Sequence, residues 1–206
     1  MRFLAVLSCA LAAAAALSSP GHAQPRPPVS VAHPGEMQVD DQPGYVPTQE
    51  EEVLPPQFQR QVVFYRTTEA PGTIIVDTPN RYLYLVQGNN RAIRYGIGVG
   101  RDGFQWSGLL KITRKAEWPD WTPPPEMIQR QPYLPRFMAG GPGNPLGDRA
   151  LYLGNTVYRL HGTNQPETIG SAVSSGCFRL VNPDIIDLYD RVPVGTRVVV
   201  RQQPTL

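Results

Sequence analysis

Between residues 61 and 201 the chain consists mainly of short runs rich in β-branched and aromatic residues, and turn-forming sequences separate these runs. Thr78-Pro79-Asn80 and Gln87-Gly88-Asn89-Asn90 are two such turns, and apolar residues alternate along residues 92–99 with the period of a strand. The predicted strands are residues 61–65, 73–77, 81–86, 92–99, 108–116, 151–153, 157–161 and 196–201. Many short strands with turns at near-regular spacing predict a mainly β fold, a β-sandwich or meander.

One short helix is predicted near the end of this β pattern. Asn182 is a favourable N-cap and Pro183 suits the first helical position. Apolar residues then recur at helical spacing (Ile185, Leu188, Tyr189 and Val192), and Gly195 follows as a stop signal. We expect this apolar face to pack against the segment that precedes the helix.

Residues 118–147 form a long insertion in the β pattern. The stretch is rich in proline, contains Trp118, Trp121 and Gly140-Gly141, and shows little regular periodicity. An irregular segment of this length inside a compact domain is usually a lid or a wall of a binding site. We therefore predict a lid-like insertion, in which the two tryptophans either pack the insertion or contact substrate.

The first 23 residues have the features of a signal peptide. Arg2 gives a positive start, residues 4–17 are almost all apolar or small, and Gly21-His22-Ala23 offers a cleavage site. The apolar run is shorter than the roughly 20 residues that a membrane-spanning helix needs. The sequence thus predicts export to the periplasm, with residues 1–23 removed by cleavage near Ala23.

Residues 24–60 are rich in proline, and their apolar residues show no period. Such a segment buries too little apolar surface to offset the entropy of ordering it. We predict a disordered tether over residues 24–60, which is either a spacer that lets the domain reach its target or a leader without a partner. The folded domain is then expected over residues 61–202.

Composition excludes several classes of protein. Lys and Arg total 19 against 17 Asp and Glu, with no concentrated basic run, so nucleic acid is not an expected partner. One of the two cysteines, Cys9, lies in the predicted leader, so the mature chain has no pair of cysteines for an intramolecular disulfide. Cysteine and histidine do not occur at the spacings of a zinc site, and no metal or other cofactor is predicted.

The cysteine that remains, Cys177, lies in the sequence Ser174-Ser175-Gly176-Cys177-Phe178-Arg179. A single thiol in an oxidising compartment is a liability unless it has a function, although a free cysteine is also commonly an inert core residue. Of the three histidines, only His161 falls in the predicted domain. We therefore interpret Cys177 as a nucleophile and His161 as its base, since a nearby imidazole activates a thiol.

The residues next to this pair suit the same chemistry. Attack on an amide creates an oxyanion, and Gly176 permits a turn in which the backbone N–H groups of Ser175, Gly176 and Cys177 are presented together. A backbone carbonyl, such as that of Gly162, is a candidate to fix the tautomer of His161.

Substrate contacts are predicted around the pair. Arg179 lies on the same strand face as Cys177, and it either binds a substrate carboxylate or forms a structural ion pair. Tyr158 either lines the pocket or fills a strand face. Ser174 and Trp118 complete the set of candidate substrate contacts.

This combination resembles the L,D-transpeptidase catalytic domain of the YkuD type, over roughly residues 62–201. The family signature is a histidine, a spacer, and a Ser-His-Gly-Cys-type element followed by an arginine or asparagine. Here His161 precedes Ser174-Ser175-Gly176-Cys177-Phe178-Arg179, and Ser175 stands where many members have histidine. The segments Trp118-Pro119-Asp120-Trp121 and Tyr152-Leu153-Gly154 look like the periplasmic branch of the family.

The resemblance implies a function on peptidoglycan stem peptides. Cys177 would attack the carbonyl at the L-centre of meso-diaminopimelate in a tetrapeptide stem, and the terminal D-alanine would leave as His161 supplies a proton. An acceptor diaminopimelate would give a 3→3 cross-link, an amine of an outer-membrane or wall-attached protein would fix that protein to the wall, and water would make the chain a carboxypeptidase. Carbapenems would acylate Cys177 in the same way. The alternative, motivated by Ser175 and the tether, is a non-catalytic peptidoglycan-binding module.

Overall fold

The computed structural model describes residues 43–203, which belong to one compact unit, Met37–Leu206. The predicted signal peptide and the first part of the predicted tether, up to residue 42, lie outside the described residues. Within residues 43–203, no helix has the length and apolar character to cross a membrane.

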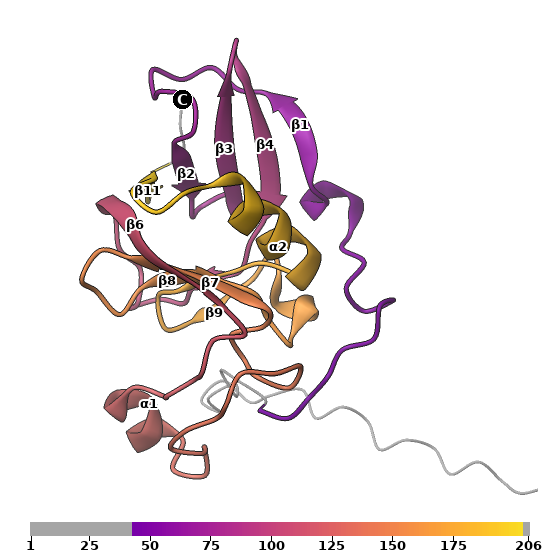
Figure 1. Cartoon of the computed structure of the whole chain (residues 1–206), viewed down its shortest axis with the longest axis vertical. Coiled ribbons are helices and arrows are strands. Elements are labelled where there is room, and N and C mark those ends of the chain that lie inside the picture. The colour runs from indigo at the N-terminus through magenta and orange to yellow at the C-terminus, as the bar shows by residue number, and fades with distance from the viewer. Residues whose placement is uncertain (1–42, 204–206) are drawn as a thin grey trace, which may run out of the picture. The chain divides into compact units, whose positions relative to one another are not determined.

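A large mixed sheet dominates the described part of the chain. Its strands lie in the order β1-β4-β3-β2-β11-β6-β7-β8-β10. Their bounds are β1 (Gln61–Phe64), β2 (Ile74–Asp77), β3 (Tyr82–Gly88), β4 (Arg91–Gly96), β6 (Gly108–Glu117), β7 (Arg149–Leu153), β8 (Arg159–His161), β10 (Phe178–Arg179) and β11 (Arg197–Arg201). Strands β5 (Val99–Gly100) and β9 (Ala172–Ser174) pair separately, in parallel. The predicted mainly β fold is confirmed (Figure 1).

Strand β6 divides this sheet into two halves. Residues 108–111 pair with β11, whereas residues 112–117 pair with β7. The two halves pack around a common core, and helix α2 (Asn182–Arg191) lies between them in Figure 1. The core contains apolar side chains from both halves and from α2, among them Leu83, Tyr95, Leu151, Leu160, Phe178, Ile185 and Leu188.

The last strands pair in a way that no local pattern specifies. β2, β3 and β4 form one antiparallel run, and β6, β7 and β8 form another. β11 joins the two runs, because it pairs in parallel with β2 and antiparallel with β6. β10 adds to the far edge in parallel with β8, which brings the segment after Cys177 beside His161.

The predicted strand over residues 92–99 is two strands in the structure. β4 ends at Gly96, and β5 begins at Val99 in the small sheet. Between them Gly98 exchanges backbone hydrogen bonds with Arg179 (2.9 and 3.0 Å). A Cβ at Gly98 would lie 3.0 Å from the carbonyl oxygen of Thr168, so the tight packing of this crossing favours glycine.

Helix α2 carries the predicted apolar face, but the predicted N-cap is wrong. Ile185, Leu188 and Val192 are buried in the core. The helix begins at Asn182 itself, and its N-cap residue is Val181, without a side-chain cap. Asn182 Oδ1, the atom that a cap would use, instead accepts from the backbone N–H of Asp148 (3.2 Å).

Residues 44–60, which we call the N-terminal strap, pack against the domain, although their composition predicts part of a tether. Leu54 is 6% exposed and forms a small apolar cluster with Ile169 and Val181. The backbone N–H of Gly44 donates to the carbonyl of Gly143 (2.8 Å). The folded unit therefore begins before residue 60, because single apolar residues between prolines are buried here without any periodic pattern.

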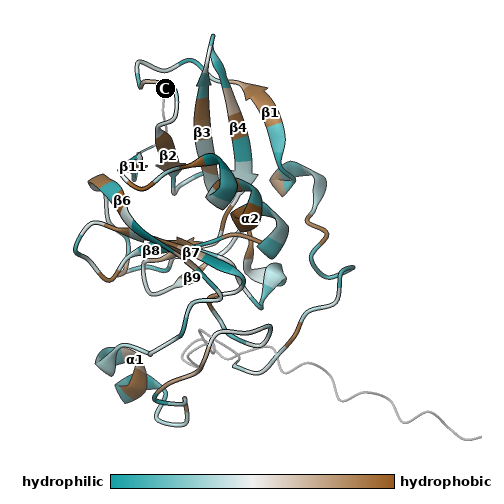
Figure 2. Cartoon of the chain, in the orientation of Figure 1, coloured by the Kyte–Doolittle hydropathy of each residue, from teal (hydrophilic) through white to brown (hydrophobic). Residues whose placement is uncertain are grey.

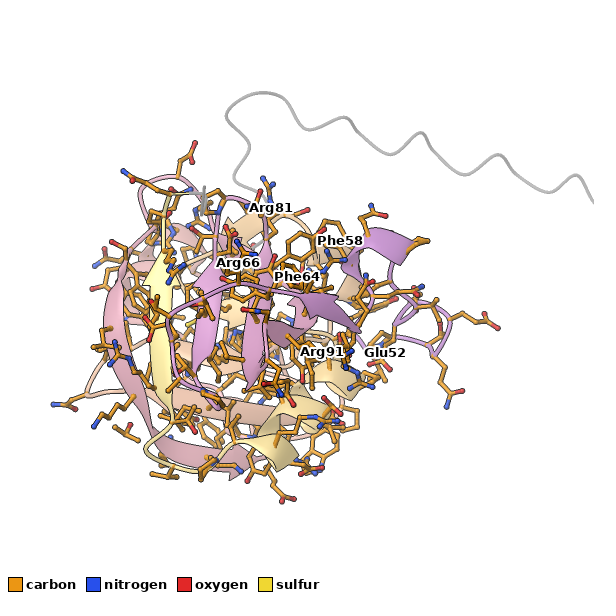
Figure 3. All side chains as sticks on the ribbon, turned by 90° about the horizontal axis from the view of Figure 1, so that it is seen from above. Glu52, Phe58, Phe64, Arg66, Arg81 and Arg91 are labelled. Atoms are coloured by element: carbon orange, nitrogen blue, oxygen red, sulfur yellow. The ribbon has the colours of Figure 1, made fainter. Side chains whose placement is uncertain are left out.

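Strand β1 forms one edge of the sheet and carries exposed apolar side chains. Figure 2 shows the hydrophobic end of β1, where Val62 is 63% and Phe64 is 72% exposed. Figure 3 shows Phe64 next to Arg66, whose guanidinium carbon lies 5.9 Å from the centroid of the ring. Arg66, two residues beyond the end of β1, thus places a charge beside the exposed Phe64 ring at this edge.

Candidate active site

Alternation along two parallel strands directs the site residues to one face of the sheet. In β8 and β10, Phe178 lies opposite Leu160 and Arg179 lies opposite His161. Leu160 and Phe178 are buried in the core. Successive side chains of a strand point to opposite faces, so the neighbours of these two residues lie on the other side of the sheet.

Cys177 immediately precedes β10, and Arg159 is the first residue of β8. Both residues line a cleft that opens to solvent, and His161 and Arg179 line the same cleft. The predicted nucleophile and the predicted base are thus brought together, with two arginines in the same cleft.

The insertion over residues 118–147 forms another wall of the cleft. It contains a short helix, α1 (Pro125–Arg130), which the sequence pattern did not predict. Trp121, Met127 and Leu146 belong to a separate apolar cluster, and all three line the cleft. The insertion is therefore a folded wall with its own small core, and it presents an apolar surface to the site.

His161 is buried and held in one tautomer. Its Nδ1 lies 2.5 Å from the carbonyl oxygen of Gly162. Because a carbonyl only accepts, Nδ1 carries the proton and Nε2 is the basic nitrogen. Burial, followed by the positive charges of Arg159 and Arg179, lowers the pKa of His161 well below its ordinary value of 6.5. The imidazole is therefore neutral at neutral pH, which is the form that a base needs.

Close packing fixes the backbone on which His161 depends. A Cβ at Gly162 would lie 2.4 Å from Oδ1 of Asn182, so only glycine fits here. Asn182 Oδ1 accepts a hydrogen bond from the amide of Asp148 (3.2 Å), and its Nδ2 donates to Thr163. Asn182, the residue wrongly predicted as an N-cap, thus ties the loop after His161 to the segment that leads into β7.

The turn before Cys177 is also held by specific contacts. Gly176 has a φ of +103°, and a Cβ there would lie 2.8 Å from the ring of Tyr158. The Gly176 N–H donates to Ser174 Oγ (3.2 Å), and this hydroxyl donates to the carbonyl of Cys177 (2.5 Å). Trp106 Nε1 donates to the carbonyl of Gly176 (2.8 Å). The turn is held in place because its backbone N–H and carbonyl groups are hydrogen-bonded and the Tyr158 ring packs against Gly176.

Cys177 is a free, partly buried thiol in contact with the segment that enters β8. Its Sγ lies 3.7 Å from the carbonyl oxygen of Val157, to which the thiol donates. Arg159 lines the same cleft as Cys177, and its guanidinium carbon lies 6.0 Å from the centroid of the Tyr152 ring. Burial by itself would lower the pKa of Arg159, but the interactions with Cys177 and Tyr152 outweigh burial and raise it. Arg159 therefore stays charged in the cleft.

Arg179 is buried at the inner end of the cleft. It is 3% exposed, and its Nη1 lies 3.5 Å from Oε1 of Gln165. Gln165 is itself fixed in position, because its backbone N–H donates to Thr163 Oγ1 (3.0 Å). The arginine is thus placed by the loop that follows His161.

Ser175 contacts the insertion. Nη2 of Arg130, in α1, donates to Ser175 Oγ (3.2 Å). The guanidinium carbon of Arg130 also lies 5.1 Å from the centroid of the Phe104 ring, and that of Arg101 lies 4.6 Å from the same centroid. The residue that replaces the usual histidine of the family is therefore linked to the wall of the cleft.

Two predicted substrate contacts do not line the cleft. Trp118 is 42% exposed, and its place in the lining is taken by the buried Trp121. Tyr158 stacks on Trp106, with ring centroids 4.4 Å apart, and packs against the core. Strand alternation explains this position. Tyr158 is two residues from Leu160, so its side chain points to the core face, whereas His161 points to the opposite face.

Arg159 is a site residue that the sequence pattern alone did not single out. It precedes His161 by two residues in a predicted strand, and the same spacing places Arg179 with Cys177. The signal was therefore available along β8. What the sequence did not contain was the parallel pairing of β8 with β10.

The described residues contain no group of three or more His, Cys, Asp or Glu that could hold a metal ion.

Comparison with known proteins agrees with this geometry. The model of the L,D-transpeptidase catalytic domain (YkuD) matches residues 71–200. The probable L,D-transpeptidase ErfK/SrfK of Escherichia coli K12 is 40% identical over 143 residues, which cover 66% of this chain and 46% of the relative. A putative L,D-transpeptidase of Fuscovulum blasticum is 37% identical over 128 residues, covering 61% of this chain and 67% of that protein. The chain spans about half the length of the E. coli relatives.

Two solved structures share the fold. The Ldtfm–avibactam carbamoyl enzyme aligns with a TM-score of 0.52 at 18% identity, over 66% of this chain and 51% of that one. An L,D-transpeptidase from Mycobacterium smegmatis aligns with a TM-score of 0.50 at 17% identity, over 63% and 58%. This chain belongs to the L,D-transpeptidase family, and the resemblance inferred from its sequence is confirmed.

Proposed function

We propose that the chain is a peptidoglycan L,D-transpeptidase with Cys177 as nucleophile and His161 as base. One observation carries the proposal: the free thiol and a neutral, tautomer-fixed imidazole come from neighbouring parallel strands and line one cleft. An inert core cysteine needs neither a histidine nor a cleft. Names of the relatives point to the same activity.

The proposed reaction has two halves. The proton of the Cys177 thiol passes to Nε2 of His161 as Sγ bonds to the carbonyl carbon at the L-centre of diaminopimelate. The amide C–N bond to the terminal D-alanine then breaks, and His161 returns the proton to the departing amine. An acceptor amine attacks the resulting thioester and gives its proton to His161. Cys177 is then released as a new amide bond forms.

The oxyanion formed in each half needs preorganised donors. The Gly176 N–H is already bonded to Ser174 Oγ, so the amides of Ser175 and Cys177 are the donors that we assign to the oxyanion. Ser174 then keeps the turn in place, and it also lines the cleft. We assign Nε2 of His161 to the proton transfer, because the carbonyl of Gly162 keeps the proton on Nδ1.

The walls of the cleft fit the donor stem. Arg179, as a cation inside the cleft, is suited to a carboxylate of the stem peptide. The apolar wall formed by Trp121, Met127 and Leu146 suits the aliphatic part of the same stem. Trp118 and Tyr158, which lie outside the lining, have no direct part in this arrangement.

The remaining parts of the proposal concern the setting of the reaction. Export through a signal peptide that ends near Ala23 would place the domain in the periplasm, next to its substrate. Diaminopimelate or the amine of an outer-membrane or wall-attached protein would be the acceptor. Carbapenems would acylate Cys177, because their strained lactam carbonyl offers the same electrophile.

Mass spectrometry of products tests the proposal. The mature protein is incubated with purified disaccharide-tetrapeptide, with Cys177→Ala as the matched control. A dimer lighter than two substrates by one D-alanine indicates 3→3 transfer, and tripeptide alone indicates a carboxypeptidase. Unchanged substrate, together with no adduct on adding a carbapenem under reducing conditions, would favour the non-catalytic binding module.

A further inference from the structure

The N-terminal strap, residues 44–60, precedes the part of the chain that matches the family, residues 71–200. Its contacts nevertheless concentrate on three successive residues where α2 begins. These contacts are an apolar cluster shared by Leu54 and Val181, a hydrogen bond from Asn182 Nδ2 to Glu52 Oε1 (2.9 Å), and one from Arg60 Nη1 to the carbonyl of Pro183 (3.4 Å). The middle one of the three residues, Asn182, also contacts the loop that follows His161.

Asn182 connects the strap to this loop, residues 162–165. Its Nδ2 donates two hydrogen bonds, one to the strap and one to the carbonyl of Thr163 (3.1 Å). Its Oδ1 accepts from a backbone N–H of the segment that leads into β7 and packs so closely on Gly162 that no Cβ fits there. In a close-packed interior a displacement of Asn182 is therefore transmitted to the Gly162 backbone, whose carbonyl contacts Nδ1 of His161.

The strap also contacts the same loop directly. Asn164 Nδ2 donates to the carbonyl of Tyr45 (3.1 Å). The hydroxyl of Tyr45 in turn donates to Glu51 Oε1, and the backbone N–H of Thr48 donates to Glu51 Oε2 (2.8 Å). These bonds fold the first part of the strap into a turn, and Glu52 follows directly after it. The position of the Glu52 carboxylate is thus set by the strap and not by the cleft.

We propose that Glu52 is a positioning residue for the reaction: through Asn182 it holds the Gly162 carbonyl that keeps the proton of His161 on Nδ1. This inference rests on the proposed function of His161 as base. A base that receives the thiol proton at Nε2 carries its own proton on Nδ1, and this tautomer depends on the acceptor at Gly162. The strap thereby supports the site, although none of its described residues lines the cleft.

A purely structural role of this contact is distinguishable from the positioning role. If Glu52 only attached the strap to α2, its loss would lower the free energy of unfolding and would leave the imidazole of His161 unchanged. The positioning role predicts a change at the imidazole itself. The measurements therefore have to report on His161 and not only on stability.

The first measurement is the tautomer of His161, read at neutral pH from the ¹⁵N chemical shifts of the imidazole. The whole mature protein is used in a His33→Gln background, so that His161 is its single histidine. A fixed Nδ1–H tautomer gives two well-separated ring shifts, and exchange with the other tautomer brings them together. Glu52→Ala is expected to bring the shifts closer than in the wild type. Glu52→Gln, which keeps an acceptor oxygen, is expected to leave them in place.

The second measurement is the rate at which a carbapenem acylates Cys177, followed by intact mass. A misplacement of about 1 Å costs about 10²-fold in rate, and Glu52 acts through one intermediate residue, so Glu52→Ala is expected to slow acylation by about three- to tenfold. With tetrapeptide the loss should fall on kcat and leave KM unchanged, because Glu52 does not line the cleft. Glu52→Gln should stay within about twofold of the wild type, since the hydrogen bond is retained.

Glu50→Ala is the matched control, because it removes the same charge from an exposed side chain of the same strap. It is expected to leave the ring shifts and the acylation rate at their wild-type values. Circular dichroism verifies that each variant is folded. The inference is wrong if Glu52→Ala keeps the wild-type shifts and rate, or if Glu50→Ala changes them equally. A Glu52→Gln protein as impaired as Glu52→Ala would also contradict it, because the acceptor would then not be the property that matters.

Glu52→Asp keeps the inference testable if Glu52→Ala does not fold. Aspartate retains the charge, but its carboxylate is one methylene further from Asn182. A folded Glu52→Asp protein with closer ring shifts and slower acylation supports the positioning role. A folded Glu52→Asp protein with wild-type shifts and rate contradicts it.

The two measurements also separate this inference from the proposed function. The ring shifts need neither a substrate nor a reactive cysteine, so they report on Glu52 even in a protein that does not turn over tetrapeptide. Shifts that depend on Glu52, in a wild-type protein that neither turns over tetrapeptide nor reacts with a carbapenem, would count against the transpeptidase proposal alone. Normal turnover with shifts that do not respond to Glu52→Ala would count against the positioning role alone.

Discussion

Asp184, at the start of α2, makes the stability of the domain depend on pH. Its side chain is nearly enclosed, with the residue 6% exposed, and Arg60 Nη1 lies 3.6 Å from its Oδ1. Burial raises the pKa of Asp184 to about 6, Arg60 opposes the rise, and Asp187 adds to it. The carboxyl is thus easier to protonate in the folded state than in the unfolded state.

The sign of the effect follows from this difference. A raised pKa in the folded state stabilises the fold fully below the unfolded value, and this stabilisation is lost as the pH rises through about 6. The interval between the ordinary 3.8 and about 6 corresponds to about 3 kcal/mol, at about 1.36 kcal/mol per pH unit. Because an unfolded carboxyl with the ordinary value of 3.8 is already partly ionised at pH 4, we expect about 2–3 kcal/mol of this between pH 4 and pH 7.

Asp184→Asn removes the titration and tests the reasoning. The free energy of unfolding is measured by urea denaturation between pH 4 and pH 7, for the wild type and the variant. From the low end of this range to the high end, the variant is expected to gain about 2–3 kcal/mol relative to the wild type. Asp190→Asn, on the exposed side of the same helix, is the control and is expected to stay within about 0.5 kcal/mol at each pH. A difference between Asp184→Asn and wild type that does not vary with pH would refute the argument.

Three further predictions concern the strap, the turn and the base. Leu54→Ala is expected to cost about 2–4 kcal/mol in urea denaturation, because Leu54 is buried against Ile169 and Val181, while the exposed Val53→Ala should change stability by less than about 0.5 kcal/mol; equal effects would mean that the strap does not pack. Gly176→Ala is expected to slow acylation of Cys177 by a carbapenem at least about tenfold with the fold retained, because the new Cβ meets Tyr158 and the φ is positive; an unchanged rate would show that the turn adapts. Since the pKa of His161 is lowered well below 6.5, the acid limb of turnover against pH should lie below this ordinary imidazole value, and a limb at 6.5 or above would contradict the buried, neutral imidazole.

The site could be predicted as far as its chemistry is local. Cys177 and His161 are singled out by scarcity, and Gly176 is marked by the turn that it permits. The strand segments follow from alternation, and the apolar face of α2 follows from helical spacing, because both patterns repeat within a few residues. These features do not depend on contacts with residues distant in the sequence.

The positions and contacts of several residues could not be predicted from local sequence, because they depend on the tertiary structure. Asn182 has the sequence context of an N-cap, but its side-chain oxygen accepts from the backbone N–H of Asp148, which arrives from a distant segment. Trp118 and Trp121 are equivalent by composition, and only the folding of the insertion buries Trp121 in the cleft wall and leaves Trp118 exposed. The strap has the composition of a tether, yet Leu54 is buried by residues far along the chain.

Residue identity and short-range period are enough to predict the mainly β character and the family, and to propose Cys177 and His161 as the reactive pair, since these signals lie in short stretches of sequence. Which arginine lies beside the base depends instead on the folded chain. Arg179 lies opposite His161 because β8 and β10 pair in parallel with a particular register, and a shift of one residue would turn the side chains of the shifted strand to the other face. That register is fixed by the burial of Leu160 and Phe178 in a core assembled from both halves of the sheet, which is a long-range property that no local pattern contains.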